Sequence, residues 1–77
     1  MDIKVLGTGC PKCKALEKAV LNSISELQLE ANVSKVEDIV QIMQFGVMQT
    51  PALVINGKVV VSGRLPNNNE LKTLLTQ

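Results

Sequence analysis

Two cysteines, Cys10 and Cys13, are the residues of this sequence whose type and spacing are best suited to chemistry. They are the only cysteines in the chain, and they lie two residues apart within the segment GCPKC. Sulfurs at this spacing can form a redox couple, supply half of a metal site, or pack as ordinary core residues. Since the spacing does not choose among the three, the elements that position the two residues have to be considered.

A helix is predicted to begin at or just after Cys10. Pro11 suits the first helical turn, where its missing N–H is not needed. Apolar residues then recur at spacings of three and four, which is typical of one buried helical face; they are Cys13, Leu16, Val20, Ile24 and Leu27. Cys10 falls at the helix N-terminus, where unpaired N–H groups and the helix dipole favour a thiolate. Cys10 is therefore expected to be the more acidic and more accessible thiol.

The segments around this helix predict further elements. Residues 2–7, with Ile3 and Val5 alternating, predict a short strand that stops at Gly7. A second strand is predicted in ANVSKVED, and Asp38 can then cap a second helix that ends at Gly46. The apolar face of that helix is predicted to consist of Ile39, Ile42 and Met43.

The second half of the chain predicts a hairpin and a closing helix. Two apolar runs, Ala52–Ile55 and Val59–Val61, flank Asn56-Gly57, the dipeptide that favours a type I′ turn. Asn67 stands three residues before Glu70, as in a capping box, ahead of Leu71, Leu74 and Leu75. The order βαβαββα predicts an α/β fold in which a four-stranded mixed sheet packs against three helices.

Length and composition indicate one small domain that covers residues 1–77. Because 45% of the residues are hydrophobic and Phe45 is the only aromatic residue, the core is expected to be aliphatic, with Met43 or Met48 filling gaps. A net charge of +1 provides no field that would favour nucleic acid or a membrane surface. The scarcity of aromatic residues also removes the platforms on which bases stack.

The expected location is the cytoplasm. No apolar run approaches the roughly 18 residues of a membrane span, and the N-terminal segment does not have the pattern of a signal peptide. In the cytoplasm thiols are mostly kept reduced, so a close cysteine pair is more often catalytic or metal-binding than structural.

The segments GCPKC and GVMQTPALVINGKVVVSGRLP, with the order of elements between them, resemble the thioredoxin and glutaredoxin superfamily. The chain is most similar to the small archaeal and bacterial thioredoxin-like redox-active disulfide proteins. The resemblance implies a thioredoxin-like fold and a protein-disulfide oxidoreductase in which Cys10 is the nucleophile and Cys13 the resolving cysteine. It also implies that the Cys10–Cys13 disulfide is the only redox group, without another cofactor, and that the Thr50–Pro51 bond is cis.

The same resemblance identifies Lys12, Thr50 and Pro51 as substrate-binding residues. Lys12 lies between the cysteines and is expected to favour the Cys10 thiolate. Pro51 begins a strand and has no N–H to donate, so extended backbone there can lie beside a substrate peptide. The implied partners are disulfide-containing proteins and a thioredoxin-reductase-like or other thiol electron donor, with neither nucleic acid nor membrane, and the protein is expected to be a monomer.

The chain also differs in sequence from the thioredoxins and glutaredoxins that it resembles. Gly9 stands before the cysteine motif, where thioredoxins usually carry tryptophan, and Pro11-Lys12 is the inner pair. The Gly-Gly-Asp element that holds glutathione carboxylates in glutaredoxins is absent, because SGRLPNNN contains no acidic residue. Lys12 and Arg64 are the residues that remain to attract a carboxylate.

Two other functions stay open at this point. Two thiolates with no histidine in the chain cannot complete a tetrahedral zinc site, so metal binding would mean a Cu(I) carrier or zinc shared by two chains. Small copper carriers have the order βαββαβ, whereas here a helix is predicted to close the chain. The third possibility is a domain that binds a partner protein along the Pro51 edge without catalysis.

Overall fold

The computed structural model describes residues 1–9 and 11–76. Its elements follow the predicted order βαβαββα. They are β1 (Asp2–Leu6), α1 (Pro11–Leu27), β2 (Asn32–Val36), α2 (Ile39–Gln44), β3 (Ala52–Ile55), β4 (Lys58–Ser62) and α3 (Asn68–Leu75). In the described part of the chain, no helix has the length and apolar character needed to cross a membrane.

The four strands form one mixed sheet in the order β2-β1-β3-β4. Strand β1 pairs in parallel with β2 and antiparallel with β3, and β3 pairs antiparallel with β4. The parallel pair is joined by α1, as parallel neighbours require a crossover, while β3 and β4 are joined by a tight turn. The α/β architecture predicted from the sequence, a four-stranded mixed sheet with three helices, is therefore confirmed.

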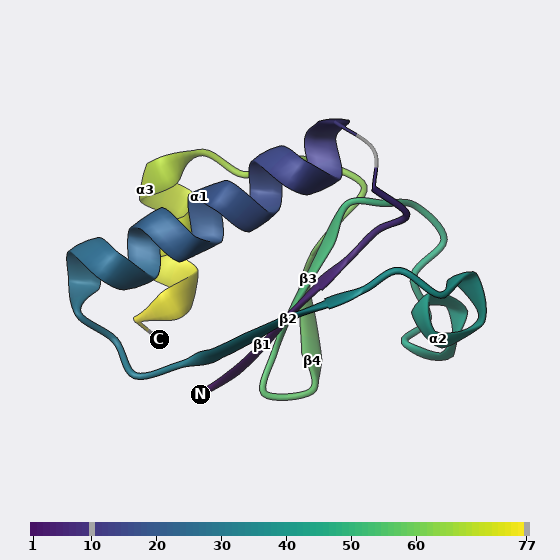
Figure 1. Cartoon of the computed structure of the whole chain (residues 1–77), viewed down its shortest axis with the longest axis horizontal. Coiled ribbons are helices and arrows are strands. Elements are labelled where there is room, and N and C mark those ends of the chain that lie inside the picture. The colour runs from purple at the N-terminus through teal and green to yellow at the C-terminus, as the bar shows by residue number, and fades with distance from the viewer. Residues whose placement is uncertain (10, 77) are drawn as a thin grey trace.

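The two faces of the sheet carry separate apolar clusters. Helices α1 and α3 lie together on one side of the sheet in Figure 1, and α2 lies apart from them. Residues of the first cluster come from β1, β3, β4, α1 and α3; they are Ile3, Val5, Leu16, Val20, Leu53, Val61, Leu71 and Leu75. The second cluster joins α2 and its following loop to the sheet through Leu6, Ile42, Val47, Ala52 and Val54. Alternation along β1 and β3 thus supplies both clusters.

Local signals at the turn and at two helix starts act as predicted. Asn56 and Gly57 have positive φ angles of 53° and 82°, as a type I′ turn requires. The Val40 N–H donates to the Asp38 carboxylate at 2.9 Å, which caps α2. The Glu70 N–H donates to the Asn67 side chain at 2.7 Å, which caps α3. The reciprocal half of the capping box is absent, because the Glu70 carboxylate binds Arg64 instead.

Packing differs from the prediction in two places. The predicted apolar face of α1 is present, with Cys13, Leu16 and Val20 buried and Ile24 and Leu27 half-buried against the core, but the polar residue Ser23 is buried as well. Neither Met43 nor Met48 fills the core, since they are 63% and 91% exposed. Helix α2 has only six residues, and of these Ile42 alone is buried. A helix this short turns one residue toward the sheet and leaves its other apolar residues in solvent.

Candidate functional site

Cys13 lies in the first turn of α1, buried against the end of β1. Only 5% of its surface is exposed. Its side chain packs directly on the backbone of Gly7: a Cβ added at Gly7 would stand 2.8 Å from the Cys13 Cβ and would overlap the sulfur. The prediction that Cys13 belongs to the buried face of α1 is confirmed. The other predicted site residue, Cys10, lies outside the described residues, so its greater accessibility stays a prediction.

A cavity of about 270 Å³ opens beside Cys13. It is bounded by α1, the β1–α1 loop and the end of β2, through Val5, Gly7, Gly9, Cys13, Lys14, Lys35 and Glu37. The Lys35 ammonium lies 3.6 Å from a Glu17 carboxylate oxygen and 3.8 Å from one of Glu37. Cys13 is therefore shielded from bulk solvent but borders a space whose rim carries charges of both signs.

Thr50 and Pro51 lie at the same end of the sheet as Cys13. The Thr50–Pro51 peptide bond is cis, and Pro51 is fully buried at the start of β3. Ala52, the next residue, pairs with Leu6, which directly precedes Gly7. Because Gly7 packs against Cys13, the pairing of β1 with β3 brings the Pro51 segment and Cys13 to the same end of the sheet.

The Pro51 segment is also held from the other side. The Gly63 N–H donates to the Pro51 carbonyl oxygen at 2.9 Å, which joins the end of β4 to the start of β3. Gln49 packs over Gly63, where an added Cβ would stand 2.6 Å from its side-chain oxygen. Gly63 has a φ of 77°, so this close approach and the backbone turn both require glycine.

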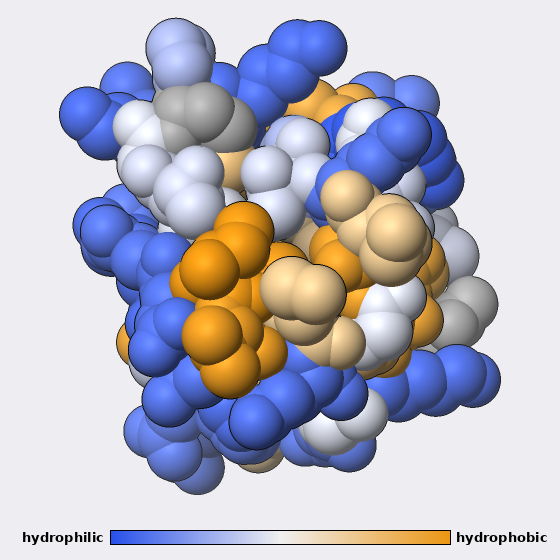
Figure 2. All heavy atoms as spheres, turned by 90° about the vertical axis from the view of Figure 1, so that its right-hand side faces the viewer, coloured by the Kyte–Doolittle hydropathy of each residue, from blue (hydrophilic) through white to orange (hydrophobic). Residues whose placement is uncertain are grey.

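An apolar groove of about 210 Å³ lies beside Thr50. It runs between the β1–α1 loop, α2 and the segment before β3, and is lined by Thr8, Ile39, Ile42, Met43, Val47, Met48 and Thr50. Figure 2 shows the apolar side chains gathered at the centre of this face, with polar residues around them. This end of the sheet thus combines a buried sulfur, the cis Thr50–Pro51 segment and an exposed apolar surface.

The structure brings together most of the residues predicted from the sequence. Cys13, Thr50 and Pro51 lie at the same end of the sheet, and Lys12 lies in the same turn as Cys13 with its side chain exposed. Sequence reasoning missed the contact of Gly7 with Cys13 and the position of Lys35 and Glu37 beside the cavity. No local pattern indicates them: Gly7 meets Cys13 because the chain turns between β1 and α1, and Lys35 and Glu37 reach the cavity because β2 lies beside β1.

Arg64, predicted to be available for a carboxylate, already holds one. Its guanidinium binds the Glu70 carboxylate of α3 through both terminal nitrogens, with Nη1 donating to Oε1 at 2.6 Å and Nη2 donating to Oε2. The hydrogen bond with Arg64 lowers the pKa of Glu70, and the same bond raises the pKa of Arg64.

Comparison with known proteins agrees with this arrangement. The family model described as a thioredoxin domain matches residues 1–76. A protein named thioredoxin from Methanothermobacter thermautotrophicus is 33% identical over 76 residues, which cover 99% of each chain. A second thioredoxin, from Methanocaldococcus jannaschii, is 34% identical over 70 residues, covering 91% of this chain and 80% of the relative. A probable thioredoxin from Archaeoglobus fulgidus is 35% identical over 69 residues, covering 86% of this chain and 75% of the relative.

Proposed function

Because this chain belongs to the thioredoxin family, whose general activity is thiol–disulfide oxidoreduction, we propose that it reduces or exchanges disulfides of partner proteins with Cys10 and Cys13. Cys10 is the nucleophile and Cys13 the resolving cysteine, and the disulfide between them is the only redox group. The main support for this assignment is the position of Cys13, which is buried at the start of α1, at the end of the sheet where the Pro51 segment also lies.

The reaction consists of two exchanges. The Cys10 thiolate attacks one sulfur of the substrate disulfide, which forms a mixed disulfide and releases the first substrate thiolate. The Cys13 thiol then loses its proton, and its thiolate attacks the Cys10 sulfur. The second substrate thiolate leaves, and the new bond is the Cys10–Cys13 disulfide. Two electrons have passed to the substrate, and a thioredoxin-reductase-like or other thiol donor returns them.

The burial of Cys13 suits the second role rather than the first. Only the thiolate attacks a disulfide, and an accessible, stabilised thiolate is needed to meet an external substrate. Cys10 directly precedes Pro11, the first residue of α1, so the unpaired N–H groups of the helix start are available to its thiolate. Cys13 is covered by Gly7 and is suited to attack a sulfur that is already held beside it.

The substrate backbone is proposed to lie beside Thr50 and Pro51. Pro51 has no N–H, and its carbonyl oxygen accepts a hydrogen bond from Gly63, which keeps this segment in place. Lys12 is exposed in the first turn of α1, between the two cysteines in sequence, and its charge is proposed to favour a thiolate. We propose the cytoplasm as the compartment, because a dithiol there is kept reduced and ready to react.

The test is the catalysed reduction of a protein disulfide, such as those of insulin, by dithiothreitol. The wild-type protein is expected to accelerate the reaction, and Cys10→Ser to abolish the acceleration. Ser25→Ala, which alters an exposed residue of α1, is the control and is expected to keep full activity. Full activity in the Cys10→Ser variant would refute the proposed role of Cys10.

A further inference from the structure

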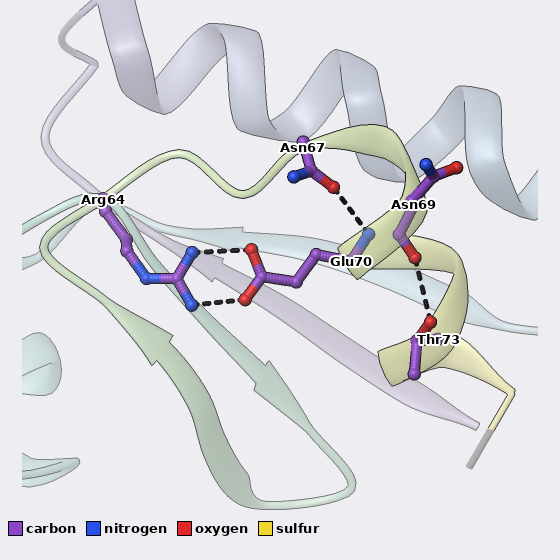
Figure 3. Close-up of polar contacts among 5 residues, drawn as sticks. All are labelled: Arg64, Asn67, Asn69, Glu70 and Thr73. Carbon is purple, nitrogen blue, oxygen red and sulfur yellow. Dashed lines mark hydrogen bonds and ion pairs between the residues drawn. The ribbon is translucent and has the colours of Figure 1, made fainter.

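Arg64, the one arginine of the chain, follows β4 and is paired with the Glu70 carboxylate of α3. Figure 3 shows the guanidinium facing the carboxylate edge on, with two parallel contacts. This is the geometry in which arginine binds free carboxylates. The Glu70 backbone is itself fixed, since its N–H donates to Asn67 at 2.7 Å. The Arg64 and Glu70 side chains remain 54% and 33% exposed, so the pair lies at the surface and within reach of a ligand.

Arg64 directly follows the residue that contacts the Pro51 segment. The Gly63 N–H donates to the Pro51 carbonyl oxygen, and the loop that carries Arg64 leaves the sheet from that point. A substrate segment that lies beside Pro51 would therefore pass close to the backbone of Arg64, whose side chain is turned toward α3 by its contact with Glu70. With its charge unpaired, Arg64 would attract substrates that carry a carboxylate near the disulfide.

The intramolecular carboxylate has an advantage over a substrate carboxylate. Glu70 lies in the first turn of α3 and is already positioned, so it competes with an effective concentration far above that of a dissolved substrate. The paired arginine therefore presents almost no net charge to the site. Removal of the Glu70 carboxylate would free the two donors of Arg64 without altering the sulfurs or Pro51.

We propose that Glu70 masks Arg64 as an anion-binding group, and thereby keeps the site from favouring disulfides that bear carboxylates. The inference rests on the proposed function, because it concerns the substrates of the same site. It assigns Glu70 a positioning role that sets charge selectivity through Arg64, outside the exchange chemistry itself. The substrates that fit are disulfides in neutral surroundings rather than small acidic disulfides.

The test compares two small disulfides with the wild-type protein and with Glu70→Gln. Oxidised glutathione carries carboxylates, and hydroxyethyl disulfide is neutral; each is reduced with dithiothreitol as donor. The ratio of kcat/KM for the acidic substrate to that for the neutral one is expected to rise about two- to fivefold in the variant, the range of one exposed ion pair. Glu70→Ala is measured too, since Gln can still accept a hydrogen bond from Arg64.

Two further measurements identify the cause. The rise is expected to shrink as salt is raised to about 500 mM, where the screening length falls to roughly 4 Å. It is expected to vanish in the double variant Arg64→Gln/Glu70→Gln. Glu26→Gln is the matched control, because it changes the net charge equally and removes an exposed ion pair with Lys72 at 2.7 Å. This control is expected to leave the ratio unchanged.

The outcomes separate the two proposals. An unchanged ratio in both Glu70 variants, with turnover of the neutral disulfide intact, would overturn the masking role and leave the proposed function standing. An equal rise in Glu26→Gln, or a rise that persists in the double variant, would also overturn it. Absence of catalysed turnover of both small disulfides by the wild-type protein would overturn the masking role alone if insulin reduction is still accelerated, and the proposed function as well if it is not.

Discussion

The backbone of Gly7 lies directly against the side chain of Cys13, so that the end of β1 sets the position of the buried sulfur. A Cβ at position 7 would stand 2.8 Å from the Cys13 Cβ and overlap Sγ. Gly7→Ala is therefore expected to destabilise the protein by about 1–3 kcal/mol, the usual result of overpacking. This exceeds the gain of about 0.4–1 kcal/mol from stiffening the unfolded chain. Urea denaturation measures the difference.

The neighbouring Thr8→Ala is the control for this prediction. Thr8 is exposed and lies in the same loop, so its truncation is expected to change the free energy of unfolding by less than about 0.5 kcal/mol. Equal stabilities of wild type and Gly7→Ala would mean that the loop moves aside at little cost, and that Gly7 does not fix the position of Cys13.

The order of the two exchanges predicts the result of removing the second sulfur. In Cys13→Ser the first exchange still occurs, but no thiolate is present to release the substrate. A mixed disulfide between Cys10 and the substrate is therefore expected to accumulate, and peptide mass spectrometry locates it. In Cys10→Ser, adducts on Cys13 are expected in far lower yield, because Cys13 is only 5% exposed. Higher yield on Cys13 than on Cys10 would reverse the two roles.

Two substitutions of Asn56 in the β3–β4 turn separate the loss of a hydrogen bond from the cost of a positive φ angle. Asn56 has a φ of 53°, and its side-chain oxygen accepts a hydrogen bond from the Asp2 N–H at 2.9 Å. Asn56→Gly keeps the backbone free to adopt positive φ and loses only the hydrogen bond, about 0.5–1.5 kcal/mol. Asn56→Ala adds about 1–2 kcal/mol for the left-handed conformation. Thermal unfolding of both variants tests this, and equal losses would contradict it.

The Glu70 carboxylate predicts how the Arg64–Glu70 pair responds to acid. The hydrogen bond from Arg64 lowers the pKa of Glu70 in the folded protein below its ordinary value of 4.5. The unfolded state then binds the proton more readily, so the pair stabilises the fold above pH 4.5 and loses this effect as the pH falls through the lowered pKa. Glu70→Gln is expected to flatten the fall in stability below pH 4.5, measured by urea unfolding at a series of pH values. An unchanged slope would show that the pair adds nothing to stability.

The elements that could be predicted from the sequence are those with strong local signals. Asn56-Gly57 sets its own turn through positive φ, and Asp38 and Asn67 cap their helices with side-chain oxygens that reach amides two and three residues ahead. Helix α1 could be recognised because apolar residues recur at helical spacing from Cys13 to Leu27, over most of its 17 residues. The candidate site followed from the cysteine spacing and from the family resemblance, which drew attention to Thr50 and Pro51.

The features that escaped prediction depend on how neighbouring elements pack and on the paths of the loops between them. Met43 has the same chemistry as a core residue, and only the short length and placement of α2 leave it exposed. Glu70 suits a capping box, but the β4–α3 loop brings Arg64 within reach, and a charged bidentate partner prevails over a backbone amide. The contact of Gly7 with Cys13 arises because the chain turns between β1 and α1. The presence of a glycine in the sequence does not by itself predict that contact.

The most direct test of the proposed function is the reduction potential of the cysteine pair, obtained from thiol-alkylation mass shifts after equilibration in graded dithiothreitol buffers with metals chelated. Thiol–disulfide oxidoreduction by Cys10 and Cys13 predicts a reversible two-electron transition with a midpoint of roughly −270 to −200 mV, the range from thioredoxin to glutaredoxins. If no disulfide between Cys10 and Cys13 forms at any potential, the exchange mechanism is contradicted, and stoichiometric Cu(I) binding by the two thiolates is the next property to measure.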